Sequence, residues 1–187
     1  MRRVFCLLPC LFLLCSCRTA SVSEQIAPFY QSANIITARL AVTVDSGTQV
    51  CDFIMDWSYD GAVSTLSVVE PASLTGVVLR ADPDARKLLY DEAVLVLPAA
   101  DGLFLSPLEM LASTFACWRE GYYESSAAES SREASSITLT WRQTAGEYDS
   151  AELSTVFDAQ TLLPLSCEYI LGGVRRMTAR FLTVAVS

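Results

Sequence analysis

Residues 36–57 read ITARLAVTVDSGTQVCDFIMDW and decide the fold class. In both halves of this stretch, apolar side chains alternate with polar or small ones, which is the period-two pattern of half-buried antiparallel strands. Residues 45–47 between the halves have the composition of a tight turn. The stretch therefore predicts two antiparallel strands with one face against a core and the other face in water.

Alternating segments of this kind recur along the rest of the chain, and short turn signals separate them. Residues 124–136, ESSAAESSREASS, are polar and low in complexity, so they predict an exposed loop. Closely spaced strands with only one or two helices do not fit a parallel βαβ fold. Further strands are expected at 62–69, 75–81, 86–90, 93–97, 137–142, 153–157, 163–171 and 177–181.

One helix is predicted at 107–120. Ser106 can cap it, Pro107 stands at the first helical position, and Glu109 follows three residues after the cap. Apolar residues then recur at helical spacing, and Gly121 is a natural stop. A second helix at 24–34 is expected despite its internal proline.

These elements predict a mainly β (α+β) fold with a curved antiparallel sheet of about nine to eleven strands. Such a sheet either closes into a barrel or leaves a groove, and one or two helices would cover its concave face. The aromatic and apolar side chains at this face have two interpretations. They line a groove for an acyl chain or an apolar peptide, or they only fill the core. The candidate groove residues are Phe53, Met55, Trp57, Leu111, Phe115 and Trp118.

The N-terminus has the build of a bacterial lipoprotein signal. Arg2 and Arg3 precede an apolar run at 4–14 that is too short to span a bilayer. Residues 14–17, LCSC, then resemble the lipobox, which implies that Cys17 receives a diacylglycerol after cleavage. The expected organisation is a signal peptide at 1–16, a lipidated tether at 17–23 and one domain at 24–187. An ordinary cleaved signal peptide is the alternative.

Composition limits the function further. The net charge of −8 becomes −10 once Arg2 and Arg3 are removed, and Lys87 is the one lysine of the chain. A chain with this negative charge is a poor match for nucleic acid or for anionic lipid headgroups. Its membrane contact is therefore expected to come from the lipid on Cys17. Three cysteines, Cys51, Cys117 and Cys167, remain in the domain, too isolated for a zinc site.

The sequence also argues against an enzyme. A chain without histidine holds no Ser-His or Cys-His pair, and it contains neither an S-x-x-K motif nor a P-loop. Its carboxylates stand at turns or on the polar face of a strand, where solubility and turn chemistry explain them. We therefore expect no catalytic residue, no metal and no cofactor.

The order of elements resembles the LolA/LolB superfamily, including the GerS-like lipoproteins of Gram-positive bacteria. The resemblance is carried by ITARLAVTVD at 36–45, by EPASLTGVVLRADPDARKLLYD at 70–91 and by FDAQTLLPLSCEYILGGVRRMTARFLTV at 157–184. It implies an incomplete β-barrel with a helical lid. It also implies a lid-gating arginine on an early strand, for which Arg39 is the candidate.

Two functions follow from the resemblance. The first is a non-enzymatic lipoprotein, anchored at the extracytoplasmic face of the cell membrane, whose apolar groove binds a lipid or a lipidated partner. The second is a GerS-like interaction protein that docks a cell-envelope enzyme and whose interior is only core. A dry apolar cavity under the helix would favour the first function, and a filled interior would rule out a groove there. An exposed apolar patch or sheet edge would favour the second function, and a uniformly charged exterior would count against it.

Overall fold

The computed structural model describes residues 21–82, 85–97, 107–120, 122–130, 135–145 and 148–187. These residues form one antiparallel sheet with the strand order β6-β5-β4-β3-β2-β1-β11-β10-β9-β8-β7. The strands are β1 Ile36–Asp45, β2 Val50–Tyr59, β3 Ser64–Glu70, β4 Val78–Ala81, β5 Arg86–Tyr90, β6 Ala93–Leu97, β7 Ser125–Ser130, β8 Ser135–Ala145, β9 Tyr148–Asp158, β10 Pro164–Leu171 and β11 Val174–Val186.

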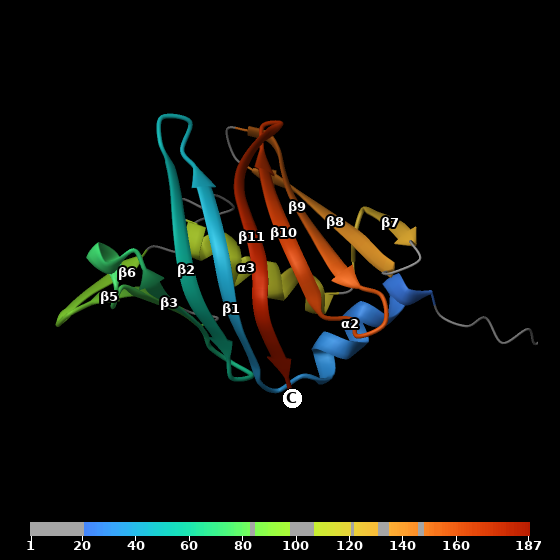
Figure 1. The fold of residues 1–187 in the computed structure, drawn as a ribbon, viewed down its shortest axis with the longest axis horizontal. Coiled ribbons are helices and arrows are strands. Elements are labelled where there is room, and N and C mark those ends of the chain that lie inside the picture. Colours follow the sequence, from blue (N-terminus) through green and yellow to red (C-terminus); the bar gives the residue numbers. More distant parts are fainter. Residues whose placement is uncertain (1–20, 83–84, 98–106, 121, 131–134, 146–147) are drawn as a thin grey trace, which may run out of the picture.

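The path of the chain explains why the sheet stays open. Strands β1 to β6 run outward from the middle to one edge, and helix α3 (Pro107–Glu120) lies on the concave side of the sheet (Figure 1). Strands β7 to β11 then return from the other edge, and β11 pairs with β1, Ile36 opposite Val186. The two edges, β6 and β7, do not pair with each other. The expected mainly β fold with an incomplete barrel is confirmed.

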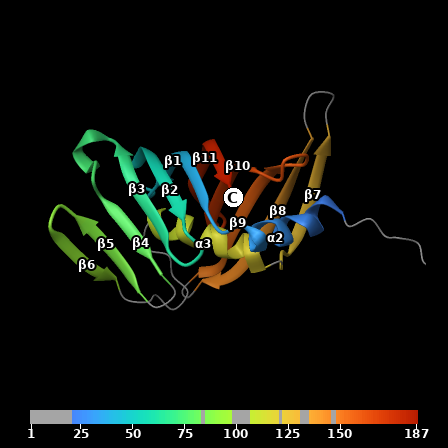
Figure 2. The ribbon, with the colours of Figure 1, turned by 90° about the horizontal axis from the view of Figure 1, so that it is seen from below.

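Alternation along the strands places the core on the concave face, around α3 (Figure 2). On β1, every second side chain from Ile36 to Val42 is buried, while Arg39 lies on the opposite, outer face. The same pattern continues through both halves of the sheet, so one apolar cluster runs beneath the helix. It includes Met55, Leu66, Leu79, Leu139, Leu153, Phe157, Tyr169 and Met177.

Helix α2 (Val22–Ser32) precedes β1 and packs against α3 and β8. It begins two residues before the expected helix, at a capping box in which the Ser21 amide donates to Glu24 at 2.8 Å. The helix continues through Pro28 because Ile26 and Tyr30, one turn apart, are both buried in the core. Tertiary packing therefore outweighs the cost of the proline.

Helix α3 carries Trp118, which lies fully buried at the centre of the core. Its indole nitrogen donates to the hydroxyl of Thr155 on β9 at 3.1 Å. Trp57 on β2 makes a matching bond to Ser64 on β3 at 2.8 Å. Five aromatic rings lie within 6.2 Å of Trp118, measured between ring centroids; they belong to Tyr30, Trp57, Phe115, Phe157 and Phe181.

Two segments differ from the sequence-based expectation. Residues 125–130 form β7 rather than a loop, although all six side chains are exposed as predicted. Backbone hydrogen bonds to β8 stabilise this strand. Because β7 is an edge strand whose side chains face solvent, it needs no apolar face. Residues 75–81 do not form one strand. A short 3-10 helix, Ala72–Leu74, precedes β4, which begins only at Val78.

The cysteines are structural thiols. Cys117 on α3 and Cys167 on β10 are buried, Cys51 on β2 is half-buried, and none of the three forms a disulfide. Burial raises the pKa of both Cys117 and Cys167 to about 12, so these thiols stay protonated at neutral pH.

The bond between α3 and β9 leads to a test of stability. Thr155→Val leaves the buried Trp118 indole without an acceptor, so it should lower the free energy of unfolding by about 1–3 kcal/mol. Urea denaturation followed by tryptophan fluorescence measures the change. Thr183→Val, at an exposed position of β11, is the matched control and should stay within about 0.5 kcal/mol of the unchanged protein.

The thiol environments lead to a second test. At pH 8 a maleimide should modify Cys51 in the folded protein and leave Cys117 and Cys167 unmodified, because only the thiolate reacts readily. All three should react after denaturation. Peptide mass spectrometry assigns each site, and rapid modification of Cys167 in the folded state would contradict its burial.

Candidate functional site

The structure brings the six predicted groove residues together on the concave side of the sheet. Met55, Trp57, Leu111, Phe115 and Trp118 are buried, and Phe53 is half-buried against the same cluster. The Trp57 and Phe115 rings lie 5.7 Å apart, and the Phe115 and Trp118 rings lie 6.2 Å apart, both nearly edge to face. At these distances the rings are in contact, so these side chains pack together and fill the space between the sheet and α3.

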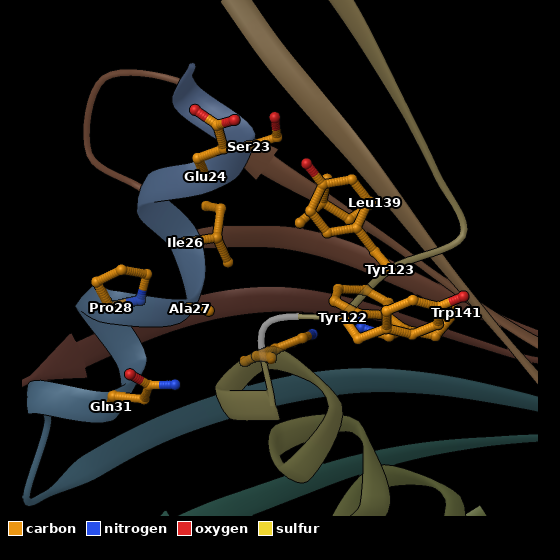
Figure 3. A pocket seen from close by; sticks show the side chains of 11 residues that line it. Ser23, Glu24, Ile26, Ala27, Pro28, Gln31, Tyr122, Tyr123, Leu139 and Trp141 are labelled. Atoms are coloured by element: carbon orange, nitrogen blue, oxygen red, sulfur yellow. The ribbon is translucent and has the colours of Figure 1, made fainter. Parts of the chain in front are cut away.

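An open cleft lies beside this cluster, between α2 and β8 (Figure 3). Its volume is about 520 Å³. Ile26 points from α2 toward Leu139 and Tyr123 on the opposite wall, and Trp118 joins the cleft to the buried cluster. The polar part of the lining comes from α2, with Ser23, Glu24 and Gln31.

Trp141 on β8 forms part of the cleft wall and is only 6% exposed. Its indole Nε1–H is buried, and no acceptor for it occurs among the described residues. The two other tryptophans, Trp57 and Trp118, each donate to a buried hydroxyl. A buried donor without an acceptor costs about 1–3 kcal/mol, so native proteins rarely keep one without a reason.

A second cleft, of about 440 Å³, lies on the other side of α3, against β2, β3 and β4. Arg119 connects the helix to the sheet here, because its guanidinium donates a hydrogen bond to the hydroxyl of Tyr59. The guanidinium carbon also lies 5.5 Å from the centre of the Tyr59 ring and 5.6 Å from that of Phe115. This cleft therefore has a cationic group on its rim, which the cleft at α2 lacks in its described lining.

Arg39 does not lie near the helix. It is on the outer face of the sheet, where it makes two hydrogen bonds to Asp56, at 2.7 and 2.8 Å. These bonds lower the pKa of the Asp56 carboxyl. The assignment of Arg39 as a lid-gating arginine is wrong, because the alternation of β1 directs its side chain away from the concave face. Arg119 of α3 makes the helix-to-sheet contact instead.

The carboxylate of Asp158 has a structural role. Asp158 accepts hydrogen bonds from the backbone amides of Gln160 and Thr161, which lower its pKa and close the turn before β10. Within the described ranges, no three histidine, cysteine, aspartate or glutamate residues lie close enough to hold a metal ion. None of the helices in those ranges has the length and apolarity needed to cross a bilayer. Cys17 and residues 1–16 lie outside the described residues.

Sequence reasoning did not single out the residues of the α2–β8 cleft. Trp141 and Leu139 were expected on one face of their strand, and Ile26 on the N-terminal helix. The alternation indicated which face each side chain takes, but it carried no signal that α2 would lie next to β8. The aromatic pair that follows α3, exposed Tyr122 and half-buried Tyr123, is a local feature that could have indicated a cleft there.

Comparison with known proteins confirms the fold. Neither a family model nor a curated protein sequence matches the chain. Among solved structures, it is similar to a domain from Vibrio parahaemolyticus described as an outer membrane lipoprotein-sorting protein domain. The TM-score is 0.53 at 11% identity, over 89% of this chain and 91% of that one.

Two further structures of related description are less similar. A LolA superfamily protein from Nitrosomonas europaea gives a TM-score of 0.47 at 11% identity, over 90% of this chain and 94% of that one. The Clostridioides difficile GerS lipoprotein, solved in complex with the CwlD amidase, gives 0.41 at 15% identity, over 88% and 95% of the two chains. The chain thus has the open, helix-covered β-sheet fold of the lipoprotein-sorting domain.

Proposed function

We propose that this protein is a non-enzymatic lipoprotein, anchored by a lipid on Cys17 at the extracytoplasmic face of the cell membrane. Its function is to bind a lipid or a lipidated partner in the cleft between α2 and β8. One observation carries the proposal: the buried indole N–H of Trp141 has no acceptor among the described residues, and Trp141 stands in the wall of a cleft that apolar and polar side chains line together. An apolar ligand with one hydrogen-bond acceptor satisfies both features.

The lining of the cleft indicates which acceptor the ligand carries. Glu24 stands on the α2 wall, and the whole chain is acidic. A free fatty acid would bring a second carboxylate close to Glu24, and like charges in a partly buried site repel each other. An ester or amide carbonyl accepts the indole hydrogen bond without adding charge. The preferred ligand is therefore a neutral acyl ester, such as a diacylglycerol group or an acylated cysteine.

The anchor and the cleft support each other. Helix α2 begins at Val22, only five residues after Cys17, and its residues form one wall of the cleft. Even a fully extended tether of this length spans less than about 18 Å. A lipid on Cys17 would thus hold the cleft close to the membrane surface, where acyl-bearing ligands are found.

A second function is favoured by the packed interior. Five of the six predicted groove residues are buried in one cluster, so the described side chains fill the middle of the concave face. A docking protein with a filled interior, which supports a cell-envelope enzyme, needs none. The two functions differ in what the protein retains when it is purified from its own membranes in mild detergent. Mass spectrometry of the retained acyl esters and proteins distinguishes the two functions. If neither an acyl ester nor a protein is recovered, both functions are excluded.

A conservative substitution tests the cleft. Trp141→Phe keeps an aromatic ring and removes the donor, so binding of a diacylglyceryl-cysteine peptide should weaken by about tenfold, the value of one hydrogen bond at the upper end of the usual range. Fluorescence titration with that peptide and with palmitate measures the effect. The unchanged protein should prefer the peptide, and palmitate should be affected less by the substitution.

The matched controls are Trp57→Phe and Trp118→Phe. Each breaks an existing hydrogen bond, so each should destabilise the protein by about 0.5–1.5 kcal/mol more than Trp141→Phe does. Equal destabilisation by all three substitutions would mean that the Trp141 indole does have an acceptor in the ligand-free protein.

The anchor is tested by Cys17→Ala. The variant should leave the membrane fraction or accumulate with its signal peptide uncleaved, because the acidic domain has no other strong attachment to lipid. Fractionation and the mass of the mature chain measure this. An unchanged membrane association would show that the attachment does not depend on lipidation.

A further inference from the structure

The two edges of the sheet differ in composition. Strand β7, SSAAES, has small or polar side chains and a glutamate, which is how edge strands avoid unwanted pairing. Strand β6, AVLVL, has five apolar residues in succession and no charge. No strand of the described residues pairs with its outer edge. An apolar edge strand that carries no charge and no proline can pair with a further strand.

The side chains of β6 are exposed on both faces. Val94, Leu95 and Val96 are 58%, 57% and 63% exposed, and Tyr90 on the neighbouring strand is 50% exposed. The β5–β6 hairpin extends beyond the part of the sheet that α3 covers (Figure 2). Isolated apolar side chains on a surface need no explanation, but a contiguous group at a sheet edge indicates an interaction site.

We propose that β6 pairs antiparallel with β6 of a second copy of this chain, about a two-fold axis at Leu95. In this register Leu95 lies opposite Leu95 of the partner subunit, and Val94 lies opposite Val96 of the partner subunit. The alternation of antiparallel hydrogen bonds, counted from the hairpin's closing pair Tyr90–Ala93, directs the amides of Val94 and Val96 to the outer edge. These groups would form the bonds of the new ladder.

A row of leucines across the sheet favours a second copy as the occupant. Leu66, Leu79, Leu88 and Leu95 lie opposite one another on consecutive strands, and so share the concave face. Leu66 and Leu79 are fully buried, Leu88 is half-buried and Leu95 is exposed. Pairing about Leu95 continues this row into the same row of the partner, and so covers the leucine that the fold leaves in water.

Charge also favours this pairing. The turn before β6 is acidic, with Asp91 and Glu92, and the start of β5 is basic, with Arg86 and Lys87. Within one copy these groups lie at opposite ends of the hairpin, since Arg86 pairs with Leu97 and Tyr90 with Ala93. Antiparallel pairing brings the acidic turn of each copy to the same end of the joined sheet as the basic end of the other, with β6 between them, twice by symmetry. The overall acidity of the two chains is screened beyond about 8 Å at physiological salt.

A five-residue edge is small for an interface, so the pairing is expected to be weak in dilute solution. Confinement to one membrane raises the effective concentration of one copy near another, and no further contact is needed. The pairing is independent of the cleft at α2 and lies at the other end of the sheet. Membranes that contain the full chain are therefore the right setting for its test.

The register is tested by cysteine cross-linking in those membranes, with copper–phenanthroline and dissolved oxygen as the oxidant. Leu95→Cys should form a disulfide-linked dimer at about tenfold the level of the unchanged protein, because confinement keeps copies close and a directly opposite pair meets the distance that a disulfide needs. Val94→Cys and Val96→Cys should cross-link with each other when they are co-expressed with different tags. Neither should cross-link with itself, since identical residues are then two positions out of register.

Exposed Val174→Cys, on the distant β10–β11 hairpin, is the matched control and should stay at the background level. Equal self-linking by Val94→Cys, Leu95→Cys and Val96→Cys would overturn the register. Linking of Leu95→Cys to a different protein would overturn the second copy as the occupant. A third outcome would also overturn the proposal: Leu95→Cys forms no dimer and a maleimide does not modify it. The edge would then be covered by other residues of its own chain.

A charge exchange tests the same pairing without a change in the edge itself. In the Leu95→Cys background, Lys87→Glu should reduce the dimer by roughly threefold, as expected for loss of exposed ion pairs. Adding Glu92→Lys should restore it. A reduction that the second substitution does not reverse would count against the proposed contact between acidic turn and basic strand.

Discussion

The concave face of the sheet is largely apolar, and Trp118 lies at the centre of the packing that buries it. Helix α3 crosses this face and also places Leu111 and Phe115 in the core. Trp118 reaches between the two halves of the sheet, contacts rings from β2, β9, β11 and α2, and satisfies its own donor on Thr155. A second route between the two halves runs through Phe115 and Tyr30, because Phe115 contacts Tyr59 of β2 and Tyr30 contacts Phe157 of β9.

The three tryptophans differ in whether their indole donors are satisfied. Two of them pair their indole nitrogens with buried hydroxyls and lie in the packed part of the interior. The third, Trp141, lies where the packing stops, at the cleft beside α2, and keeps an unsatisfied donor. Side chains of one chemical type therefore have two roles, which follow from whether a neighbouring strand supplies a hydroxyl. Sequence pattern cannot distinguish these roles, because all three tryptophans occupy inward-facing positions of their elements.

Much of the fold could be predicted from local patterns. The alternation in 36–57 placed the correct faces of β1 and β2, and the cap and spacing at 106–121 placed α3, since these signals arise within one element. Predictions failed where a partner decides the outcome. Residues 125–130 become a strand because β8 is available to pair with them. The role of Arg39 failed for another reason: the resemblance implied a contact with the helical lid, but the alternation of β1 directs this side chain to the outer face. The position of α2 beside β8, and so the cleft, depends on contacts more than a hundred residues apart.

The pairing of the first strand with the last has a consequence for how the chain reaches its folded state. Strand β1 has β2 on one side, but its other neighbour, β11, ends at Val186, and Ser187 closes the ladder onto Ile35. The middle of the sheet therefore cannot form until β11 is available, so formation of the core depends on contacts between segments far apart in the sequence. A chain that is synthesised from its N-terminus keeps the inner edge of β1 unpaired until β11 emerges.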